Sequence, residues 1–530
     1  MNAVDVSRPA EHSTDRLDGW LLNRPDQRAD APAVVDSLPD GSLAPRSYGE
    51  LRSQVARWAA RLDELRLEIG SRVIVEAHNG AAPVAMLLAC SRAGLTYVPV
   101  SPEAPTARVQ AIVEAAEPAL YLQATNVIRP IELPDGIGTG RFEWEAGISW
   151  DRPPAAAAPR QRRTPTATDP AYIIFTSGTT GMPKGVVMSH RGVLAFYAAM
   201  LAERIVGPAD RVASTSPLQF DLSLLDIGLA LGSGAALVPV PRELLRWPRR
   251  LVAFLEQAEV TQVDGVPSIW RQTLRHEQQR LRSLNRIRGV LFSGEEFPIA
   301  ELRMLQAALP GVRVTNCYGP TECMAISLTP IENPLPDTVD RLSIGRAHQG
   351  AEMLLIGEDA ALITSPDVVG EIHVRTPSLF SGYWNDPEGS RRAIVVDPIE
   401  PRSGQLVLKT GDRGSLGADG AMYYRGRSDS MVKVRGNRIE LAEIEQRLSE
   451  VPGATSARVL ADTDAGGDSQ LYAFVAAEVL DREGFADQLR SHCVRLLPSY
   501  MVPARIEVLD AMPTTANGKV DRAVLSASIG

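Results

Sequence analysis

The chain has 530 residues, of which 44% are hydrophobic and 22% are charged, and it carries a net charge of −9. This length predicts roughly three or four folding units, and the composition is typical of a soluble globular enzyme. The negative charge argues against a general nucleic-acid binder, and the lack of any run of about 18 apolar residues argues against a membrane span.

The cysteines and the amino-terminal residues indicate the compartment. The four cysteines form no CxxC pair and have no metal-ligand spacing; they are Cys90, Cys317, Cys323 and Cys493. This pattern predicts a reducing environment. Residues Met1–Asp18 lack the apolar segment of a secretory signal. We therefore expect a cytoplasmic protein, a monomer or weak dimer, with neither nucleic acid nor membrane as a partner.

The amino-terminal half alternates helical periods with short β-branched runs. Leu51–Leu65 and Pro83–Arg92 have the spacing of helices, and Val73–Ala77 between them reads as a buried strand. A second series of strands, separated by helices, comprises Arg211–Ser214, Ala236–Pro239, Gln262–Val266 and Gly289–Ser293. This alternation predicts βαβ units around mostly parallel sheets.

The composition and pattern of the sequence change at two places. Arg152–Asp169 is rich in Pro, Ala and Arg and is predicted to be an extended surface connection. From about Val369 short strands with turn signals follow, at Gly370–Arg375, Gln405–Lys409 and Met422–Arg425. Beyond Gly426 a compact α+β segment is expected, with helices at Leu441–Ser449 and Phe485–Leu496 and strands at Ala457–Leu460 and Tyr472–Ala476. We predict a core domain over residues 1–425, a hinge over 426–430 and a lid domain over 431–530.

The most informative local signal is Tyr172–Val186, with the sequence YIIFTSGTTGMPKGV. An apolar strand runs into a loop of Thr, Ser and Gly that is followed by Lys184. Glycines let backbone N–H groups approach an oligophosphate closely, and the hydroxyls and the lysine add donors and charge. The loop is not a Walker A motif, which requires Ser or Thr directly after the lysine.

Eight further motifs, in order along the chain, carry a family resemblance together with the Tyr172–Val186 string. They are Ser47–Leu51 (SYGEL), Arg92–Pro99 (RAGLTYVP), Asn316–Glu322 (NCYGPTE), Gly370–Tyr383, Lys409–Asp412 (KTGD), Gly426–Glu445, Leu497–Pro503 (LPSYMVP) and Asn517–Arg522 (NGKVDR). Over nearly its whole length the sequence resembles the adenylate-forming superfamily of acyl-CoA synthetases, luciferases and nonribosomal peptide synthetase adenylation domains. The resemblance implies an α/β fold: a large N-terminal domain of two doubly wound βα subdomains and a distorted β-barrel subdomain, followed by a small mobile α+β C-terminal domain.

The resemblance also implies ATP and Mg²⁺ as cofactors. In the first half-reaction a substrate carboxylate attacks the α-phosphorus of ATP and pyrophosphate leaves, so cations and N–H donors must converge where negative charge accumulates. Lys519 resembles the family's catalytic lysine, Glu322 would hold Mg²⁺, and Thr180 and Lys433 join them as catalytic residues. The nucleotide would also contact Thr176, Ser177, Gly178, Thr179, Thr180, Lys184, Asn316, Tyr318, Gly319, Thr321, Asp412 and Arg427.

Three roles within this set are specific. Tyr318 would stack on adenine, Asp412 would accept hydrogen bonds from the ribose hydroxyls, and Arg427 would assist at the ribose or phosphate. Asp429 matches the family's hinge, about which the small domain is expected to turn after adenylation. That rotation would withdraw Lys519 and present Lys433–Gly436 to the thiol acceptor.

Asp221, in the string FDLS, indicates an amino acid substrate. Amino-acid-activating members have an aspartate here, which pairs with the substrate ammonium, and members that activate aryl or fatty acids usually lack it. The alternative is that Asp221 caps the following helix. By alignment the pocket wall would consist of Asp221, Leu222, Leu225, Asp264, Leu291, Ser293, Cys317, Ala325 and Ile326.

The side chain of the substrate stays open at this point. Asp264 in an otherwise apolar wall suggests a basic, hydroxy- or amide-bearing amino acid, because a buried carboxylate needs a donor. Asp264 could instead turn toward a neighbouring arginine. The Asp-Leu-Leu opening resembles free-standing proline-activating enzymes, and Leu291 with Ser293 resembles pockets for small polar amino acids.

The acceptor is expected to be a separate carrier protein. The chain ends eight residues after Arg522, which leaves no room for a carrier domain. Gly466–Ser469 (GGDS) resembles a phosphopantetheine site but lies between two predicted strands and is interpreted as a turn. We predict transfer of the aminoacyl group to the phosphopantetheine thiol of that carrier, with coenzyme A as a weaker alternative. The competing functions are a ligase joining coenzyme A to an aryl or aliphatic acid, and a nucleotide-binding protein without catalysis.

Overall fold

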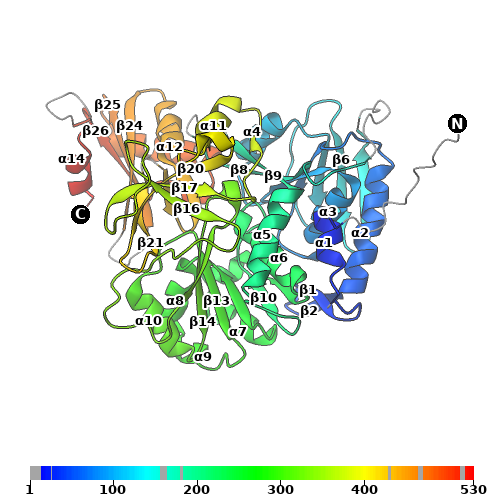
Figure 1. The fold of residues 1–530 in the computed structure, drawn as a ribbon. Coiled ribbons are helices and arrows are strands. Elements are labelled where there is room, and N and C mark those ends of the chain that lie inside the picture. The colour runs from blue at the N-terminus through cyan, green and yellow to red at the C-terminus, as the bar shows by residue number, and fades with distance from the viewer. Residues whose placement is uncertain are drawn as a thin grey trace.

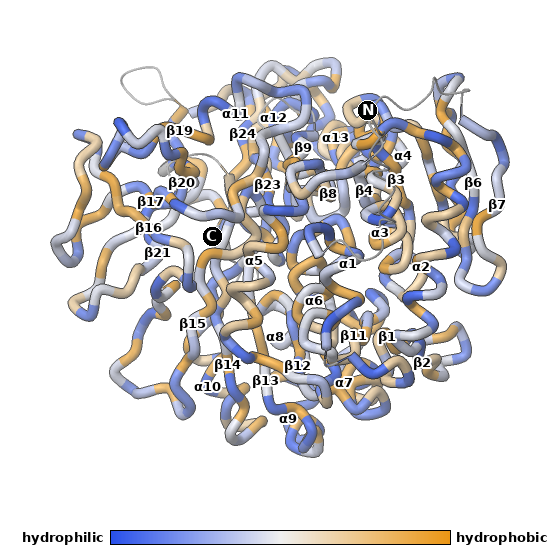
Figure 2. Tube along the Cα trace, turned by 45° about the vertical axis from the view of Figure 1, so that its right-hand side comes forward, coloured by the Kyte–Doolittle hydropathy of each residue, from blue (hydrophilic) through white to orange (hydrophobic). Residues whose placement is uncertain are grey.

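The computed structural model describes residues 14–25, 27–154, 164–178, 183–427, 431–463, 469–513 and 520–529. Two large sheets lie beside each other with helices between and around them, and a smaller sheet and the carboxyl-terminal residues pack across their ends (Figure 1). Apolar stretches follow the inner strands, whereas hydrophilic stretches lie in the outer loops (Figure 2).

The first large sheet is built mainly from the amino-terminal residues. Its eight strands, in spatial order, are β18 (Gly382–Tyr383), β9 (Lys184–Ser189), β8 (Pro170–Thr176), β4 (Thr96–Val100), β3 (Arg72–Glu76), β5 (Leu120–Ala124), β6 (Gly138–Glu143) and β7 (Gly147–Arg152). The strands from β8 to β6 pair in parallel, and antiparallel strands lie at both edges. The helices of this half are α1 (Leu17–Leu22), α2 (Tyr48–Asp63), α3 (Ala81–Ala93) and α4 (Thr106–Ala116).

The second large sheet has the same plan. Its strands, in spatial order, are β15 (Ser327–Ile331), β14 (Arg313–Tyr318), β13 (Gly289–Ser293), β12 (Gln262–Gly265), β10 (Arg211–Ser214), β11 (Ala236–Pro239), β1 (Pro32–Ser37) and β2 (Leu43–Ser47). The central strands pair in parallel, and β15 and β2 close the edges antiparallel. Its helices are η1 (Arg242–Arg246), α7 (Pro248–Gln257), α8 (Ser268–His276), α9 (Gln278–Leu281), α10 (Ile299–Ala308) and η2 (Thr321–Cys323).

Two central helices join the sheets. α5 (His190–Ala202) packs on β8 and β9, and α6 (Asp221–Gly232) packs on β10 and β11, while the two helices contact each other. A helix enclosed in this way must be apolar on all sides, and the residues of α6 from Ser223 to Gly232 are buried. A Cβ at Gly228 would lie 2.2 Å from the ring of Tyr197, so only glycine allows this close approach.

The third sheet and the small domain complete the fold. The third sheet is antiparallel and consists of β16 (Glu352–Ile356), β17 (Val369–Arg375), β20 (Leu406–Leu416), β19 (Ile394–Val396) and β21 (Met422–Arg427). Beside it lie α11 (Pro387–Ala393) and η3 (Pro401–Ser403). The expected distorted barrel is therefore a five-stranded sheet, whose edge strands β16 and β19 do not pair with each other in the described chain.

The small domain has its own core. Its elements are the hairpin β22 (Met431–Val434) and β23 (Asn437–Glu440), then α12 (Leu441–Ser449), β24 (Ala454–Thr463), β25 (Ser469–Ala477), α13 (Arg482–Leu496), η4 (Ser499–Met501), β26 (Arg505–Leu509) and α14 (Arg522–Ala527). One apolar cluster consists only of residues between Val434 and Val508, as expected for a separate folding unit.

The predicted fold class, a large α/β domain followed by a small α+β domain, is confirmed. Arg211–Ser214, Ala236–Pro239, Gly289–Ser293 and Leu441–Ser449 have the predicted bounds. The hinge Asp429, half of the Arg152–Asp169 connection and most of the GGDS turn lie outside the described residues. The domain limits 1–425, 426–430 and 431–530 therefore stay predictions. No helix in the described parts of the chain has both the length and the hydropathy that crossing a bilayer requires.

Candidate active site

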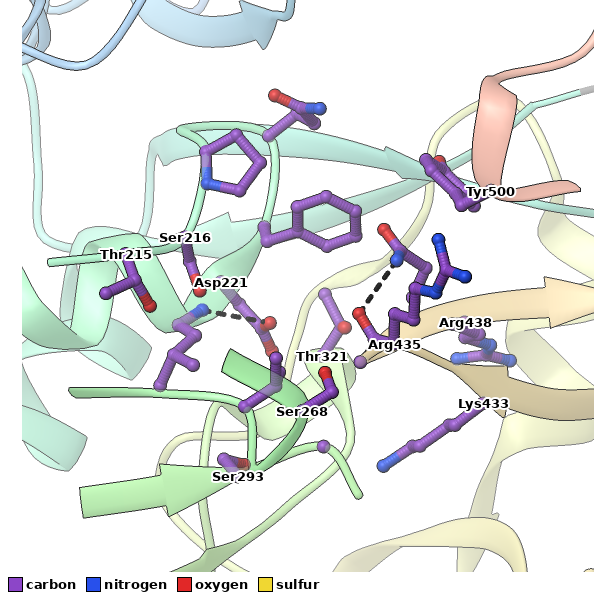
Figure 3. Close-up of a pocket in the computed structure, with 18 of the residues that line it drawn as sticks. Thr215, Ser216, Asp221, Ser268, Ser293, Thr321, Lys433, Arg435, Arg438 and Tyr500 are labelled. Atoms are coloured by element: carbon purple, nitrogen blue, oxygen red, sulfur yellow. Dashed lines mark hydrogen bonds between the residues drawn. The ribbon is translucent and has the colours of Figure 1, made fainter. Parts of the chain in front are cut away.

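A cavity of about 610 Å³ lies where the second large sheet meets the small domain. Its floor is formed at the carboxyl ends of β10, β12, β13 and β14, which is where open α/β sheets bind ligands. The β22–β23 hairpin and η4 border it from the other side. Figure 3 shows Lys433 reaching from the hairpin toward the space bordered by Ser293, Thr321 and Asp221.

The structure brings twelve of the predicted site residues into this cavity wall. They are Thr176, Ser177, Asp221, Leu222, Leu225, Ser293, Cys317, Gly319, Thr321, Asp412, Arg427 and Lys433. The described residues that were predicted for the site but do not line the cavity are Gly178, Lys184, Asp264, Leu291, Asn316, Tyr318, Glu322, Ala325 and Ile326. Thr179, Thr180, Asp429 and Lys519 lie outside the described residues.

The Thr176–Lys184 loop begins and ends in paired strands. β8 ends at Thr176, whose hydroxyl donates to the carbonyl of Lys184 at 3.3 Å, and β9 begins at Lys184. The ammonium of Lys184 lies 3.4 Å from the centre of the Tyr383 ring. Burial lowers the pKa of Lys184, and Glu322 opposes that shift. A lysine held in this way supplies positive charge at the end of the loop.

Asp221 begins α6 and is half-buried in the cavity wall. One carboxylate oxygen accepts the N–H of Leu222 at 3.1 Å. Burial raises the pKa of Asp221 to about 6, although the charge of Lys433 and a hydrogen bond from Thr321 lower it. The side chain therefore touches the start of its own helix and also faces the cavity, but the N-cap residue of α6 is Phe220, without a side-chain cap hydrogen bond, so Asp221 does not occupy the capping position.

The neighbouring wall is apolar, with small polar groups at one side. Leu222 and Leu225 follow Asp221 on α6, and Ser293 and Cys317 are register partners on β13 and β14. Burial raises the pKa of the Cys317 thiol to about 12, so it is uncharged. Leu291, Ala325 and Ile326, predicted for the wall, are fully buried behind it.

Asp264, also predicted to line the pocket, faces the opposite way. It is fully buried, and its Oδ1 accepts a hydrogen bond from Gln262 at 2.7 Å. Its carboxyl adjoins that of Asp226, whose Oδ2 accepts from Ser214 at 2.6 Å. Burial raises the pKa of both carboxyls, so the pair retains a proton, as two adjacent buried acids must. Asp264 therefore gives no reason to expect a basic side chain on the substrate.

Asp412 is the centre of a second polar group in the cavity. Its carboxylate accepts the hydroxyl of Tyr318 at 2.6 Å and forms an ion pair with Arg427. Asn316, two residues before Tyr318, donates to the carbonyl of Ser343 at 2.9 Å. A carboxylate paired with an arginine can accept further hydrogen bonds from a diol.

Glu322 lies in η2 directly behind this wall and is 3% exposed. Its Oε1 accepts the hydroxyl of Tyr383 at 2.6 Å and a guanidinium N–H of Arg438 at 2.8 Å. Burial opposes ionisation, but Arg438 and Tyr383 outweigh it and hold the pKa of Glu322 at about 2. Its Oε2 is buried and has no hydrogen-bond partner among the described residues.

That unpartnered oxygen fits a divalent cation. The described residues contain no group of three or more acidic, His or Cys side chains that could hold a metal alone. Mg²⁺ is usually bound by one or two carboxylates together with substrate phosphates and water. A single ionised glutamate near the Thr176–Lys184 loop meets that requirement.

The small domain contacts the site through its hairpin. Gly436, with a φ of 73°, donates its N–H to Glu295 at 2.6 Å, and a Cβ there would lie 2.2 Å from Val266. The ring of Tyr500 in η4 lies 6.3 Å from that of Phe220. The hairpin tip is thus seated in the cavity mouth.

Four further residues contact predicted site residues but were not assigned roles from the sequence: Arg438, Glu443, Tyr383, and Arg108, which donates to the carbonyl of Thr176. Arg438 and Glu443 belong to the Gly426–Glu445 motif and Tyr383 ends the Gly370–Tyr383 motif. The signal available for these three was a charged or hydroxyl side chain within a recognised motif, since such groups are buried only with partners, whereas Arg108 lies in none of the motifs.

Comparison with known proteins places most of the chain in one family. Residues 21–384 match the AMP-binding enzyme family, and residues 443–519 match the AMP-binding enzyme C-terminal domain. An L-proline--[L-prolyl-carrier protein] ligase of Pseudomonas fluorescens is 34% identical over 91% of this chain and 94% of its own length. A ligase of the same name from Streptomyces coelicolor is 33% identical over 93% of each chain.

A solved structure is similar over nearly the whole fold. The crystal structure of IdnL1 is 48% identical in sequence and superposes with a TM-score of 0.87, covering 95% of this chain and 100% of its own. Both the large and the small domain are therefore present in that relative.

Proposed function

Because this chain belongs to the AMP-binding enzyme family, we propose that it activates the carboxylate of an amino acid with ATP as an aminoacyl-AMP and transfers the aminoacyl group to the phosphopantetheine thiol of a carrier protein. The observation that carries the proposal is the position of Asp221. Its carboxylate borders the same cavity as Thr176, Ser177 and Asp412, so an ammonium, a phosphate and a ribose can be held together.

In the first half-reaction each end of the cavity has a distinct task. Asp221 holds the substrate ammonium, which directs the substrate carboxylate toward the α-phosphate. Asp412, paired with Arg427, accepts the ribose hydroxyls. Lys184 and the N–H groups of the Thr176–Lys184 loop hold the outer phosphates, and Lys519 stabilises the charge that develops at the reacting phosphate.

Glu322 is the residue that would hold Mg²⁺, which would neutralise the phosphate charge as pyrophosphate leaves. The unpartnered Oε2 of Glu322 supports this role.

In the second half-reaction the hairpin side of the cavity receives the thiol. Lys433 and Arg435 of the hairpin and Arg242 and Arg246 of η1 line this side. Four cationic side chains favour an anionic acceptor, and the phosphodiester of a phosphopantetheine arm has that charge. The carrier-protein names of the two relatives support this acceptor.

The wall beside Asp221 favours a small or medium apolar amino acid, such as proline, over a basic one. Leu222 and Leu225 present apolar surface, Cys317 is uncharged, and Asp264 faces Asp226 instead of the cavity. A cationic side chain would therefore lose its hydration without a compensating partner.

The test is pyrophosphate exchange into ATP across a panel of α- and β-amino acids, benzoate-type acids and fatty acids. Both classes of amino acid belong in the panel, because Asp221 recognises the ammonium and not the carbon that carries it. Exchange confined to amino acids is expected. Exchange with the acids that lack an ammonium would select a coenzyme A ligase instead, and no exchange with any compound would refute adenylation.

Replacement of Glu322 by Gln tests the metal role. Gln keeps the hydrogen bond from Tyr383 but removes the charge that would hold Mg²⁺. We expect the exchange rate at limiting Mg²⁺ to fall by about 10²-fold, the effect of losing one electrostatic contact at a reacting phosphate, with partial recovery at high MgCl₂.

The matched control is Glu371→Gln, at a carboxylate that pairs with Lys409 outside the cavity wall. If the Glu322→Gln variant depends on MgCl₂ as the wild-type protein does, Glu322 does not hold Mg²⁺.

The pKa of Asp221 predicts an acid limb in the pH profile. Burial raises this pKa to about 6, so the carboxylate that pairs with the ammonium is ionised above pH 6 and protonated below it. The value of kcat/KM for the amino acid should fall roughly tenfold per unit below that pH. The measurement is pyrophosphate exchange from pH 5 to 8 at saturating ATP; a flat profile would contradict the assignment.

A further inference from the structure

A pair of aspartates lies between α6 and the second large sheet, behind the cavity wall. Asp226 on α6 and Asp264 on β12 are fully buried, and neither has a part in the proposed reaction. Leu225 directly precedes Asp226 on the helix, and Leu222 lies four residues before it; both leucines line the cavity. Positions four apart share one face of a helix. The face that carries the cavity residues therefore depends on what holds Asp226.

Each of the two carboxyls has one oxygen with a partner and one without. Oδ2 of Asp226 accepts the hydroxyl of Ser214 at 2.6 Å, and Oδ1 of Asp264 accepts an N–H of Gln262 at 2.7 Å. Ser214 and Asp264 are register partners on the adjacent strands β10 and β12. The other two oxygens, Oδ1 of Asp226 and Oδ2 of Asp264, are buried and have no hydrogen-bond partner among the described residues. Two neighbouring acceptors can satisfy each other only if a hydrogen lies between them.

The surroundings of the pair favour such a hydrogen. Burial raises the pKa of Asp264 to about 7 and holds that of Asp226 well above its usual value. A hydrogen bond between them raises the pKa of Asp226 and lowers that of Asp264, which places the proton on Asp226. The ionisable groups nearby are acids too: Tyr197 on α5, Cys317 on β14 and Asp221 on α6. No cation is among the described groups that act on the pair, so a proton has to reduce its charge.

We propose that Asp226 and Asp264 are positioning residues that share one proton, and that this hydrogen bond fixes α6 on the second large sheet so that Asp221 meets the substrate ammonium. This inference rests on the proposed function. Most side chains of α6 belong to an apolar cluster, and hydrophobic attraction has no preferred direction. A hydrogen bond has a direction, so it sets how the helix is turned and shifted on the sheet.

Two substitutions of Asp226 test the bridge. Asparagine can accept the hydroxyl of Ser214 and donate an N–H to Asp264, so it keeps the bridge, whereas alanine removes it. We expect Asp226→Ala to raise KM for the amino acid by about 10–10²-fold, the usual effect of misplacing a binding group. Asp226→Asn should raise it by no more than about threefold, because one neutral hydrogen bond replaces another. KM for ATP should change by less than about twofold in both variants, because other groups hold the nucleotide.

Asp264→Ala breaks the same bridge from the side of the sheet, and it serves if Asp226→Ala does not fold. It should raise KM for the amino acid in the same range as Asp226→Ala. The double alanine variant should be no worse than either single variant, because all three lack the same hydrogen bond. Pyrophosphate exchange into ATP at varied amino acid measures each KM, and thermal unfolding of each full-length variant shows whether it is folded.

Infrared spectroscopy tests the shared proton without the use of activity. The C=O stretch of an undissociated carboxylic acid is distinct from the stretches of a carboxylate. At pH 8 Asp221, with a pKa of about 6, is ionised, whereas Asp226 should keep its proton. The difference spectrum between the wild-type protein and Asp226→Asn should therefore contain a carboxylic acid band, and that band should shift in D₂O.

Asp210→Ala is the matched control for a loss of stability alone. Asp210 is buried, directly precedes β10 at the end away from the cavity, and pairs with Thr261 and Arg288. Its removal should lower the unfolding temperature and leave KM for the amino acid unchanged. The inference is overturned by a similar rise of KM in this control, by equal effects of Asn and Ala at Asp226, by an unchanged KM in both single alanine variants, or by the absence of the acid band. The absence of pyrophosphate exchange with every amino acid would refute the proposed function separately, since the infrared band does not depend on catalysis.

Discussion

Replacement of Asp221 by Ala is expected to lower kcat/KM for the amino acid by about 10²–10³-fold and to leave KM for ATP nearly unchanged. The ammonium of the bound substrate would lose the carboxylate proposed as its partner in a partly desolvated wall, and breaking such a pair costs about 3–5 kcal/mol. ATP does not contact Asp221 in the proposed arrangement, since Asp412 and the Thr176–Lys184 loop serve the nucleotide. The measurement is pyrophosphate exchange at varied amino acid and varied ATP.

Asp221→Asn separates the two roles that the structure allows for this residue. Asparagine still accepts the N–H of Leu222, the contact that Asp221 makes at the start of α6, and it is as good a helix-terminus residue as aspartate. If pairing with the ammonium is the function, Asn should be nearly as damaging as Ala and should abolish the acid limb near pH 6. An Asn variant with near-normal exchange, together with an Ala variant that mainly unfolds at lower temperature, would assign Asp221 to its contact with Leu222 at the start of α6 alone.

The fold was predictable wherever local signals were sufficient. Arg211–Ser214, Ala236–Pro239 and Gly289–Ser293 are short apolar strands with turn residues beside them, and their bounds were predicted without error. The strand beginning at Gln405 was predicted too short, because β20 continues to Leu416 through alternating buried and exposed residues and a bulge. Where a strand pairs on two sides, its length depends on partners that lie far away in the sequence.

The candidate site shows the same division. Asp221, at the start of α6, and Asp412, within β20, could be found because each sits at a fixed place in a motif. The orientation of Asp264 could not be found, since it depends on Gln262 and on Asp226 of another element. Arg438 lies inside a recognised motif, yet its partner Glu322 is set by how the small domain sits on the large one. Motifs identify which residues are present; tertiary contacts decide which of them meet.

Lys519→Ala is expected to slow formation of the aminoacyl-adenylate by about 10²–10³-fold, the usual loss when one donor to developing charge is removed. Lys519 lies outside the described residues, so this role rests on the NGKVDR motif and on the match of residues 443–519 to the AMP-binding enzyme C-terminal domain. Transfer of the aminoacyl group from preformed adenylate to a thiol should change by no more than about twofold, because a residue that acts on the triphosphate has no task once pyrophosphate has left. Lys409→Ala, at a half-exposed lysine paired with Glu371, is the matched control and should retain both reactions. Equal losses in the two half-reactions would mean that Lys519 supports the fold of the small domain, and normal pyrophosphate exchange would mean that another cation stabilises the reacting phosphate.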